Sequence, residues 1–164
     1  MTSIPKTLAD LLARESIRHT IASYTMAGDR LKVDDFAAVF TEDAILETEG
    51  VPEHDSFCHE GRQAIRQWME RWREGASSGG EGVHQATFVR HHLATCLIDI
   101  VDDSHAHART YWTAYTDIGP DHAGYYVDTL RKEGDRWLIA WRRIRLDWRS
   151  EGSLMFTAIE RTAR

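Results

Sequence analysis

The sequence is poor in cysteine, and it has no long uninterrupted hydrophobic run. Its two cysteines, Cys58 and Cys96, are too few for a disulfide framework and are not spaced as metal ligands. No stretch approaches the roughly 20 apolar residues that cross a membrane as a helix. The N-terminal residues lack the basic region and apolar core of a secretory signal. We therefore expect a soluble cytoplasmic protein without a membrane partner.

An excess of positive charge is also missing. Lysine and arginine number 20 against 26 aspartate and glutamate residues, which gives a formal net charge of -6. The basic residues are dispersed except near the C-terminus, so the electrostatic footprint of a nucleic-acid-binding protein is lacking. We expect a small molecule as the partner, and no nucleic acid.

Aromatic residues, by contrast, are plentiful, with six Trp, five Tyr and five Phe. Together with a hydrophobic fraction of 42% they indicate a globular chain. A length of 164 residues suits a single domain that buries its own core. We expect residues 1–164 to form one domain, with a core from about residue 8 to residue 150.

The spacing of hydrophobic residues predicts mainly helices in the N-terminal half of the chain and long strands in the C-terminal half. Helices are expected over residues 8–28, 32–40 and 61–75, and a strand over residues 41–50. Period-two alternation predicts four further strands, over residues 87–101, 105–118, 123–132 and 136–148. The segment GPDH, residues 119–122, is expected as a turn between two of them. This order predicts an α+β fold, in which a curved mixed or antiparallel sheet wraps around helices as a cone with an apolar cavity.

The first helical segment has two apolar stripes that do not coincide. Leu8, Leu11 and Leu12 fall on one side of an ideal helix, while Ile17, Ile21 and Tyr24 fall on nearly the opposite side. A break or a change of packing partner is therefore expected near residue 14.

Several segments of the sequence are similar to one protein family. They read IRHTIASYTMAGDRLKVDDFAAVFTEDAILETEG, GRQAIRQWM, VRHHLATCLIDI and GYYVDTLRKEGDRWLIAWRRI. The chain thereby resembles the SnoaL-like branch of the nuclear transport factor two-like superfamily, which includes polyketide cyclases, ketosteroid isomerase, scytalone dehydratase, bile-acid dehydratase and a dehydrochlorinase. The resemblance implies a cystatin-like cone. It implies less about function, because the same cone hosts enzymes, binding proteins and non-catalytic subunits.

The resemblance also implies four catalytic positions. Asp29, just after the first long helix, matches the aspartate of the dehydratase and dehydrochlorinase members, and His92 matches their histidine. Those relatives carry asparagine four positions after the histidine, where this sequence has Cys96. Tyr24 matches a tyrosine of the bile-acid dehydratase relatives, and Arg142 matches an arginine of the dehydrochlorinase.

These side chains suit proton abstraction next to a carbonyl or ring carbon. A neutral histidine accepts a proton at cellular pH, and a carboxylate on its other ring nitrogen fixes the tautomer and stabilises the imidazolium. A tyrosine hydroxyl polarises a carbonyl or donates to a leaving oxygen. Such a site needs no metal and no cofactor. Each residue also has a possible non-catalytic role. Asp29 can bind backbone amides, His92 can form hydrogen bonds with its neighbours, and Tyr24 can belong to the core.

Strand alternation separates the two adjacent histidines of the segment TFVRHHLATCLIDIVDD. His92 shares a face with Ala94, Cys96 and Ile98, whereas His91 falls on the opposite face. Small residues beyond His92 would leave room for a pocket beside it. His91 is accordingly expected to be structural or to lie at a subunit interface.

Arg142 falls on an apolar strand face, where an unpaired charge would be costly. It pairs with a buried carboxylate, for which Asp128 is the candidate, or it meets a ligand.

Aromatic and apolar side chains either line the pocket or form core: Trp68, Met69, Trp72, Phe88, Trp112, Tyr115, Tyr126 and Trp141. His105 and His107 lie at strand spacing, but a third metal ligand is missing nearby, so we expect a solvated strand start. His54 and His59 are expected at the surface.

The sequence therefore favours a cofactor-independent lyase or isomerase acting on a hydrophobic cyclic molecule such as a steroid, polyketide or aromatic intermediate. Elimination of water is the reaction favoured, with His92 as base, Asp29 orienting it, Tyr24 as acid and Arg142 auxiliary. The alternative is a non-catalytic binding or assembly subunit. The two differ in whether Asp29 and His92 lie within hydrogen-bond reach of each other and open to the cavity, and a His92 on the outer face would argue against the enzyme. An epoxide hydrolase would need two carboxylates bridged by arginine, a trio that the sequence does not assign. A homo-oligomer, dimer or trimer, is expected by resemblance.

Overall fold

A computed structural model describes residues 7–51, 53–78 and 86–155 of the protein. Its helices are α1 (Leu8–Gly28), α2 (Val33–Ala37) and α3 (Arg62–Ser78), with a short 3-10 turn, η1, at Glu53–Asp55. Its strands are β1 (Phe40–Glu49), β2 (Cys58–Glu60), β3 (Arg90–Ile100), β4 (His105–Thr116), β5 (Gly119–Glu133) and β6 (Arg136–Arg149). Residues 156–164, FTAIERTAR, whose sequence is compatible with a short helix or a frayed tail, lie outside the described residues.

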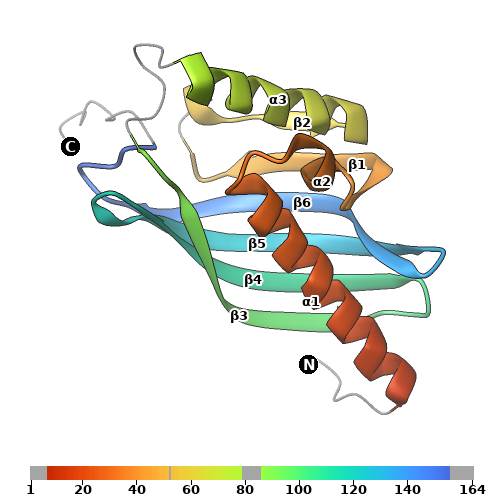
Figure 1. Cartoon of the computed structure of the whole chain (residues 1–164). Helices are drawn as coiled ribbons and strands as arrows, with labels where there is room; N and C mark the ends of the chain where they lie inside the picture. The colour runs from red at the N-terminus through yellow and green to blue at the C-terminus, as the bar shows by residue number, and fades with distance from the viewer. Residues whose placement is uncertain (1–6, 52, 79–85, 156–164) are drawn as a thin grey trace.

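The six strands form one mixed sheet in the order β2-β1-β6-β5-β4-β3. Strands β1 and β6 run parallel, and all other neighbours are antiparallel. Figure 1 shows α1 crossing one face of the curved sheet, with α2 and α3 beside it near β1. The α+β arrangement expected from the order of elements is thereby confirmed.

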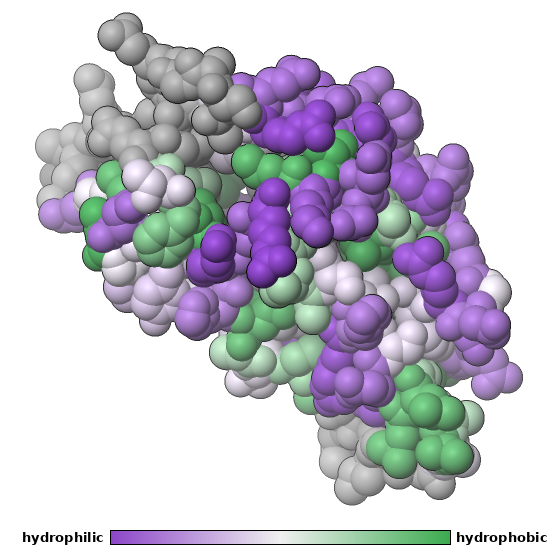
Figure 2. Space-filling view, in the orientation of Figure 1, coloured by the Kyte–Doolittle hydropathy of each residue, from purple (hydrophilic) through white to green (hydrophobic). Residues whose placement is uncertain are grey.

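Helix α1 is continuous, so the expected break near residue 14 is wrong. A capping box begins the helix, in which the Thr7 side chain accepts from Asp10 N–H and the Asp10 side chain accepts from Thr7 N–H. The second apolar stripe, with Ile17 at 0% exposure, packs on the sheet, whereas the leucines of the first stripe remain exposed. Figure 2 shows these apolar residues at the N-terminal end of α1, where Leu8, Leu11 and Leu12 are 53–71% exposed.

Strand β5 begins earlier than the sequence predicts. Residues 119–122 are the first residues of the strand, and the turn from β4 is the two residues Asp117 and Ile118. The expected turn at GPDH is therefore wrong. This correction brings Asp121 and His122 into the sheet, where both are buried.

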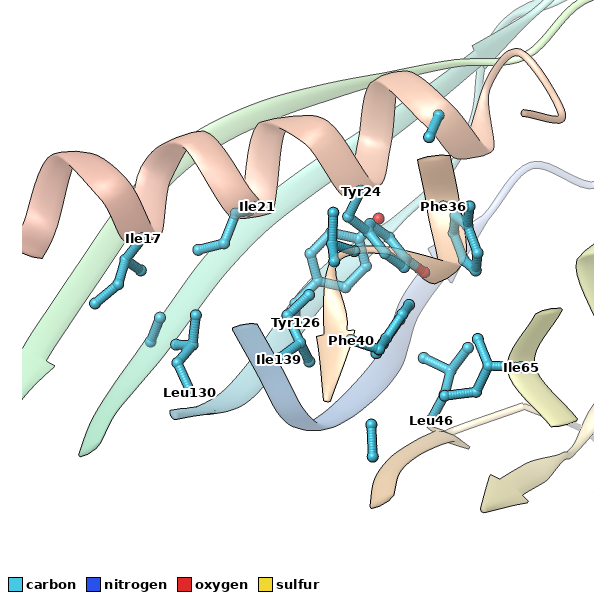
Figure 3. Close-up of a cluster of buried hydrophobic side chains, with 14 of the residues drawn as sticks. Ile17, Ile21, Tyr24, Phe36, Phe40, Leu46, Ile65, Tyr126, Leu130 and Ile139 are labelled. Atoms are coloured by element: carbon cyan, nitrogen blue, oxygen red, sulfur yellow. The ribbon is translucent and has the colours of Figure 1, made fainter. Parts of the chain in front are cut away.

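Aromatic rings pack the middle of the space between the helices and the sheet (Figure 3). The Tyr24 ring lies 4.7 Å from that of Phe36, 5.8 Å from that of Phe40 and 5.6 Å from that of Tyr126, measured between centroids. Polar side chains gather beyond these rings, at the end where β3 and β5 begin. None of the described helices is both long and apolar enough to span a membrane.

Candidate functional site

Asp29 and His91 form the most direct pairing of a carboxylate with an imidazole in the interior. Asp29 is the C-cap of α1, and the aspartate Oδ1 lies 2.6 Å from His91 Nδ1. Its Oδ2 accepts the backbone N–H of His91 at 2.9 Å. Because both carboxylate oxygens are used, the position of the imidazole is fixed, and the neutral ring carries its proton on Nδ1. Proton exchange with a ligand then falls to Nε2.

His92 does not take part in this pair, so the expectation that Asp29 orients His92 is wrong. The His92 ring instead lies 4.6 Å from that of Tyr115, between centroids, and His92 is exposed. A β-bulge explains the exchange of faces. Leu93 pairs with Trp112 and Cys96 with Thr110, so that Ala94 and Thr95 together stand opposite one residue of β4. One extra residue turns every side chain before it to the other face.

The inward histidine belongs to a row of residues that crosses three strands. His91 of β3 pairs with Ala114 of β4, and Ala114 pairs with His122 of β5. The methyl group of Ala114 leaves room for the two imidazoles to lean toward each other, and their centroids are 5.9 Å apart. In the next row, Leu93, Trp112 and Gly124 pair in the same way.

Asp121 and His122 form a second buried pair that the sequence reading missed. His122 Nδ1 lies 2.7 Å from Asp121 Oδ1, and the two side chains are 6% and 0% exposed. Both residues were assigned to a turn. The adjacent Asp-His dipeptide was the available signal, and it becomes meaningful only once β5 is extended to Gly119.

Arg142 pairs with Asp128, as the apolar strand face predicts. The pair is bidentate, with Nε to Oδ1 and Nη2 to Oδ2 both at 2.7 Å, and both side chains are fully buried. The guanidinium lies between two tyrosine rings, 4.1 Å from the centroid of Tyr24 and 4.2 Å from that of Tyr126. This confirms the ion pair, and Asp128 contacts Arg142 rather than facing a pocket.

Tyr24 remains protonated over the whole neutral range. Burial raises the pKa of its hydroxyl to about 12, although the positive charge of Arg142 acts in the opposite direction. Burial likewise raises the pKa of Tyr126 well above its usual value. Either hydroxyl can therefore donate a hydrogen bond but cannot serve as a base at neutral pH.

The other expected pocket residues divide between the interior and the surface. Trp112 and Tyr126 are buried beside the histidines, whereas Trp68 and Trp72 are half-buried on α3, with Trp68 packed on Phe57 at 4.9 Å. Phe88 is 42% exposed, and Tyr115 lies with His92 on the outer face of β4. Tyr115 therefore faces away from His91, and the pocket roles expected of Phe88 and Tyr115 stay predictions.

Three further histidines of the described residues make local contacts. His105 bonds to Asp102 in the turn before β4, and His54 lies beside Asp55. The His59 ring stacks on Phe57 at 5.0 Å. In the described ranges, no three His, Cys, Asp or Glu side chains gather as metal ligands.

A cavity of about 410 Å³ lies beside α1, and neither His91 nor His122 lines it. Its lining includes His19, Thr20, Met26, Arg30, Arg136 and Trp137. None of the residues of the two Asp-His pairs contributes to it. This cavity is therefore distinct from the group of polar residues around His91.

The SnoaL-like domain family matches residues 9–143 of this chain. A proposed scytalone dehydratase from Novosphingobium aromaticivorans has a similar structure, with 22% identity, coverage of 95% of this chain and 98% of that one, and a TM-score of 0.68. The comparison with curated proteins gives no significant match.

Two further solved structures represent different functions. The hexachlorocyclohexane dehydrochlorinase LinA-type3 from Novosphingobium barchaimii is 12% identical over 93% of this chain and 99% of its own, with a TM-score of 0.68. The beta subunit of a proposed aromatic-ring-hydroxylating dioxygenase from Novosphingobium aromaticivorans is 18% identical over 91% and 98%, also with a TM-score of 0.68. At these identities the likeness concerns the fold alone.

Proposed function

This chain belongs to the SnoaL-like family, and we propose that it is a cofactor-independent lyase or isomerase acting on a hydrophobic cyclic molecule. The observation that carries the proposal is the pair of Asp29 and His91, with 2.6 Å between Oδ1 and Nδ1. The criterion stated for His92 is not met, because His92 is exposed and the carboxylate of Asp29 bonds to His91 instead. The contact of Asp29 with His91 supports His91 as the base in its place. The side chain of His91 is 25% exposed while that of Asp29 is 8% exposed, so the base is accessible and its partner is shielded.

In the proposed reaction, His91 Nε2 removes a proton from a carbon next to a carbonyl. The electron pair of that C–H bond forms a new double bond, the C–O bond to the neighbouring carbon breaks, and the hydroxyl group leaves as water with the proton that His91 delivers to it. Asp29 stabilises the imidazolium, which then returns its proton. Tyr24, protonated at neutral pH, is the proposed hydrogen-bond donor, and Arg142 holds the Tyr24 ring in place. We propose elimination of water as the specific reaction, with steroid, polyketide or aromatic intermediates as substrates.

Proton abstraction can be measured without the natural substrate. Incubation of 1-tetralone in D2O, followed by NMR, reports exchange of the protons next to its carbonyl. The wild type is expected to accelerate this exchange over buffer, and His91→Gln is expected to lose about 10²–10⁴-fold of that rate, the usual contribution of a general base. Asp29→Asn should also slow exchange, because the imidazole loses its anchor.

His92→Gln is the matched control, since it changes the neighbouring imidazole on the outer face and should retain the wild-type rate. Equal rates for His91→Gln and the wild type would contradict the proposed base. Binding of 1-tetralone without any exchange above buffer would favour the non-catalytic binding function, which the dioxygenase beta subunit with the same fold represents.

A further inference from the structure

The second Asp-His pair is held more rigidly than the first. Asp121 accepts hydrogen bonds from the hydroxyl of Ser153 at 2.6 Å, from the Leu154 N–H at 2.7 Å and from the hydroxyl of Thr116 at 3.1 Å, in addition to its contact with His122. Burial acts to raise the pKa of this carboxyl, but the hydrogen bonds from Ser153, Leu154 and His122 outweigh it and hold the pKa below its usual value. The carboxylate therefore stays ionised and fixes the His122 ring.

Trp112 lies between the two histidines that the aspartates hold. The centroid of its indole is 5.7 Å from that of His91 and 5.4 Å from that of His122, and both contacts are edge-to-face. Its other side stacks on Tyr126, at 5.7 Å between centroids. Three neighbours thus fix the orientation of the indole from both sides.

The indole N–H of Trp112 has no hydrogen-bond acceptor among the described residues, although the side chain is only 3% exposed. A buried donor without an acceptor costs free energy, and native proteins rarely leave one in place without a reason. The two carboxylates of the Asp-His pairs bond to other groups: Asp29 bonds to His91, and Asp121 bonds to His122, Thr116, Ser153 and Leu154.

Two small residues lie beside the indole in the sheet. A Cβ on Gly124 would come 3.0 Å from Trp112 Cζ2 and 1.9 Å from the Arg145 carbonyl oxygen, so the indole packs closely on the backbone of β5. Ala114 occupies the row between His91 and His122 and adds only a methyl group. The donor therefore lies in the row next to the proposed base.

We propose that the Trp112 indole N–H binds the carbonyl or hydroxyl oxygen of the substrate. The substrate class is then a flat cyclic ketone or alcohol, and a ring of the same shape without an acceptor oxygen binds more weakly. The oxygen lies beside the row of His91 and His122, so that the adjacent carbon comes near the proposed base. The catalytic meaning of this site rests on the proposed function, but the binding of oxygen does not.

Two matched ligands test the inference by binding alone. The molecule 1-tetralone has a carbonyl oxygen on a bicyclic frame, and tetralin has the same frame without oxygen. Calorimetry on the wild type should give tighter binding of 1-tetralone, and Trp112→Phe should weaken that binding about tenfold while changing tetralin binding far less, because one hydrogen bond to a buried donor is lost. Trp148→Phe, at an exposed tryptophan, should keep the wild-type preference.

A second measurement avoids the risk that Trp112→Phe disturbs packing. In 15N-labelled wild type, the indole N–H resonance of Trp112 should move downfield on addition of 1-tetralone and stay nearly fixed on addition of tetralin. An unmoved resonance at saturation, equal affinity of Trp112→Phe and wild type for 1-tetralone, or no binding of 1-tetralone at millimolar concentration would each overturn the inference. Preference for 1-tetralone without proton exchange would contradict only the proposed function.

Discussion

At the scale of single residues, Arg142 and Asp128 form an ion pair between two charged groups in the core. Both side chains are fully buried, and two bonds of 2.7 Å join them, while Arg142 Nη1 has no hydrogen-bond partner among the described residues. Burial disfavours the charge of Arg142, but the Asp128 carboxylate raises the pKa of the guanidinium above its usual value. Removing one partner would leave the other as an unpaired charge in the core.

We therefore expect Arg142→Met to lower the free energy of unfolding by about 3–5 kcal/mol, as broken buried ion pairs do. The double variant Arg142→Met with Asp128→Leu should recover most of this loss, because it leaves no unpaired charge. Urea unfolding of the wild type and the variants measures both changes. If the double variant were no more stable than Arg142→Met, the charge pairing would not explain the cost.

The partner of Arg142 could be predicted from the sequence because an unpaired charge in the core costs too much free energy to be left in place. An arginine on an apolar strand face needs a partner, and Asp128 could be named because it lies on the inward face of the neighbouring strand. The family resemblance implies a role for Asp29, and its carboxylate does meet an imidazole. The identity of that imidazole depended on strand geometry, which single residues do not determine.

At the scale of elements, a bulge in β3 and an early start of β5 explain why the sequence did not predict which histidines face the interior. Counting back from the buried Ile98 with a period of two places His92 inward, but the bulge at Ala94 and Thr95 adds one residue and places His91 inward instead. Neither residue has a distinctive sequence signal for a bulge. The turn signal GPDH similarly concealed Asp121 and His122, because glycine and proline are also tolerated at the start of a strand.

Asp121 also joins β5 to the chain that follows β6. Its backbone carbonyl accepts from the Ser150 N–H at 2.7 Å, and its carboxylate accepts from Ser153 and Leu154. The pKa of Asp121 is lower in the folded protein than in the unfolded chain. At a pH between these two pKa values, the unfolded chain therefore binds more protons than the folded protein does. Folding therefore gains free energy from this carboxylate above its unfolded pKa of about 3.9, and the gain is lost as pH falls toward the folded pKa.

We expect Asp121→Asn to lower stability at pH 7 by on the order of 2 kcal/mol, because buried donors lose a charged acceptor. Thermal melts from pH 7 to pH 3 should also show a shallower decline in Tm than the wild type shows. The exposed Asp135→Asn variant, in the turn between β5 and β6, removes a carboxylate without touching this cluster and should follow the wild type. An unchanged acid slope for Asp121→Asn would place the acid sensitivity elsewhere.

At the scale of the whole molecule, the outer face of the sheet is a candidate surface for self-association. Leu97 on β3 is 53% exposed and Tyr111 on β4 is 49% exposed. The Tyr111 ring lies 6.2 Å from that of Tyr125, between centroids, and Arg109 covers Tyr125 with its guanidinium 4.0 Å from the ring centroid. Exposed aromatic and apolar groups with arginine nearby are enriched at protein interfaces.

We therefore propose that the protein forms a dimer or trimer through this face. Light scattering after size exclusion should give two or three times the 18.8 kDa of one chain. Tyr111→Glu should shift the mass toward one chain, because two-fold or three-fold contact would bring several new negative charges together. Leu11→Glu, at the exposed start of α1, should keep the oligomer. Dissociation by Leu11→Glu but not by Tyr111→Glu would instead assign the interface to the N-terminal leucines of α1.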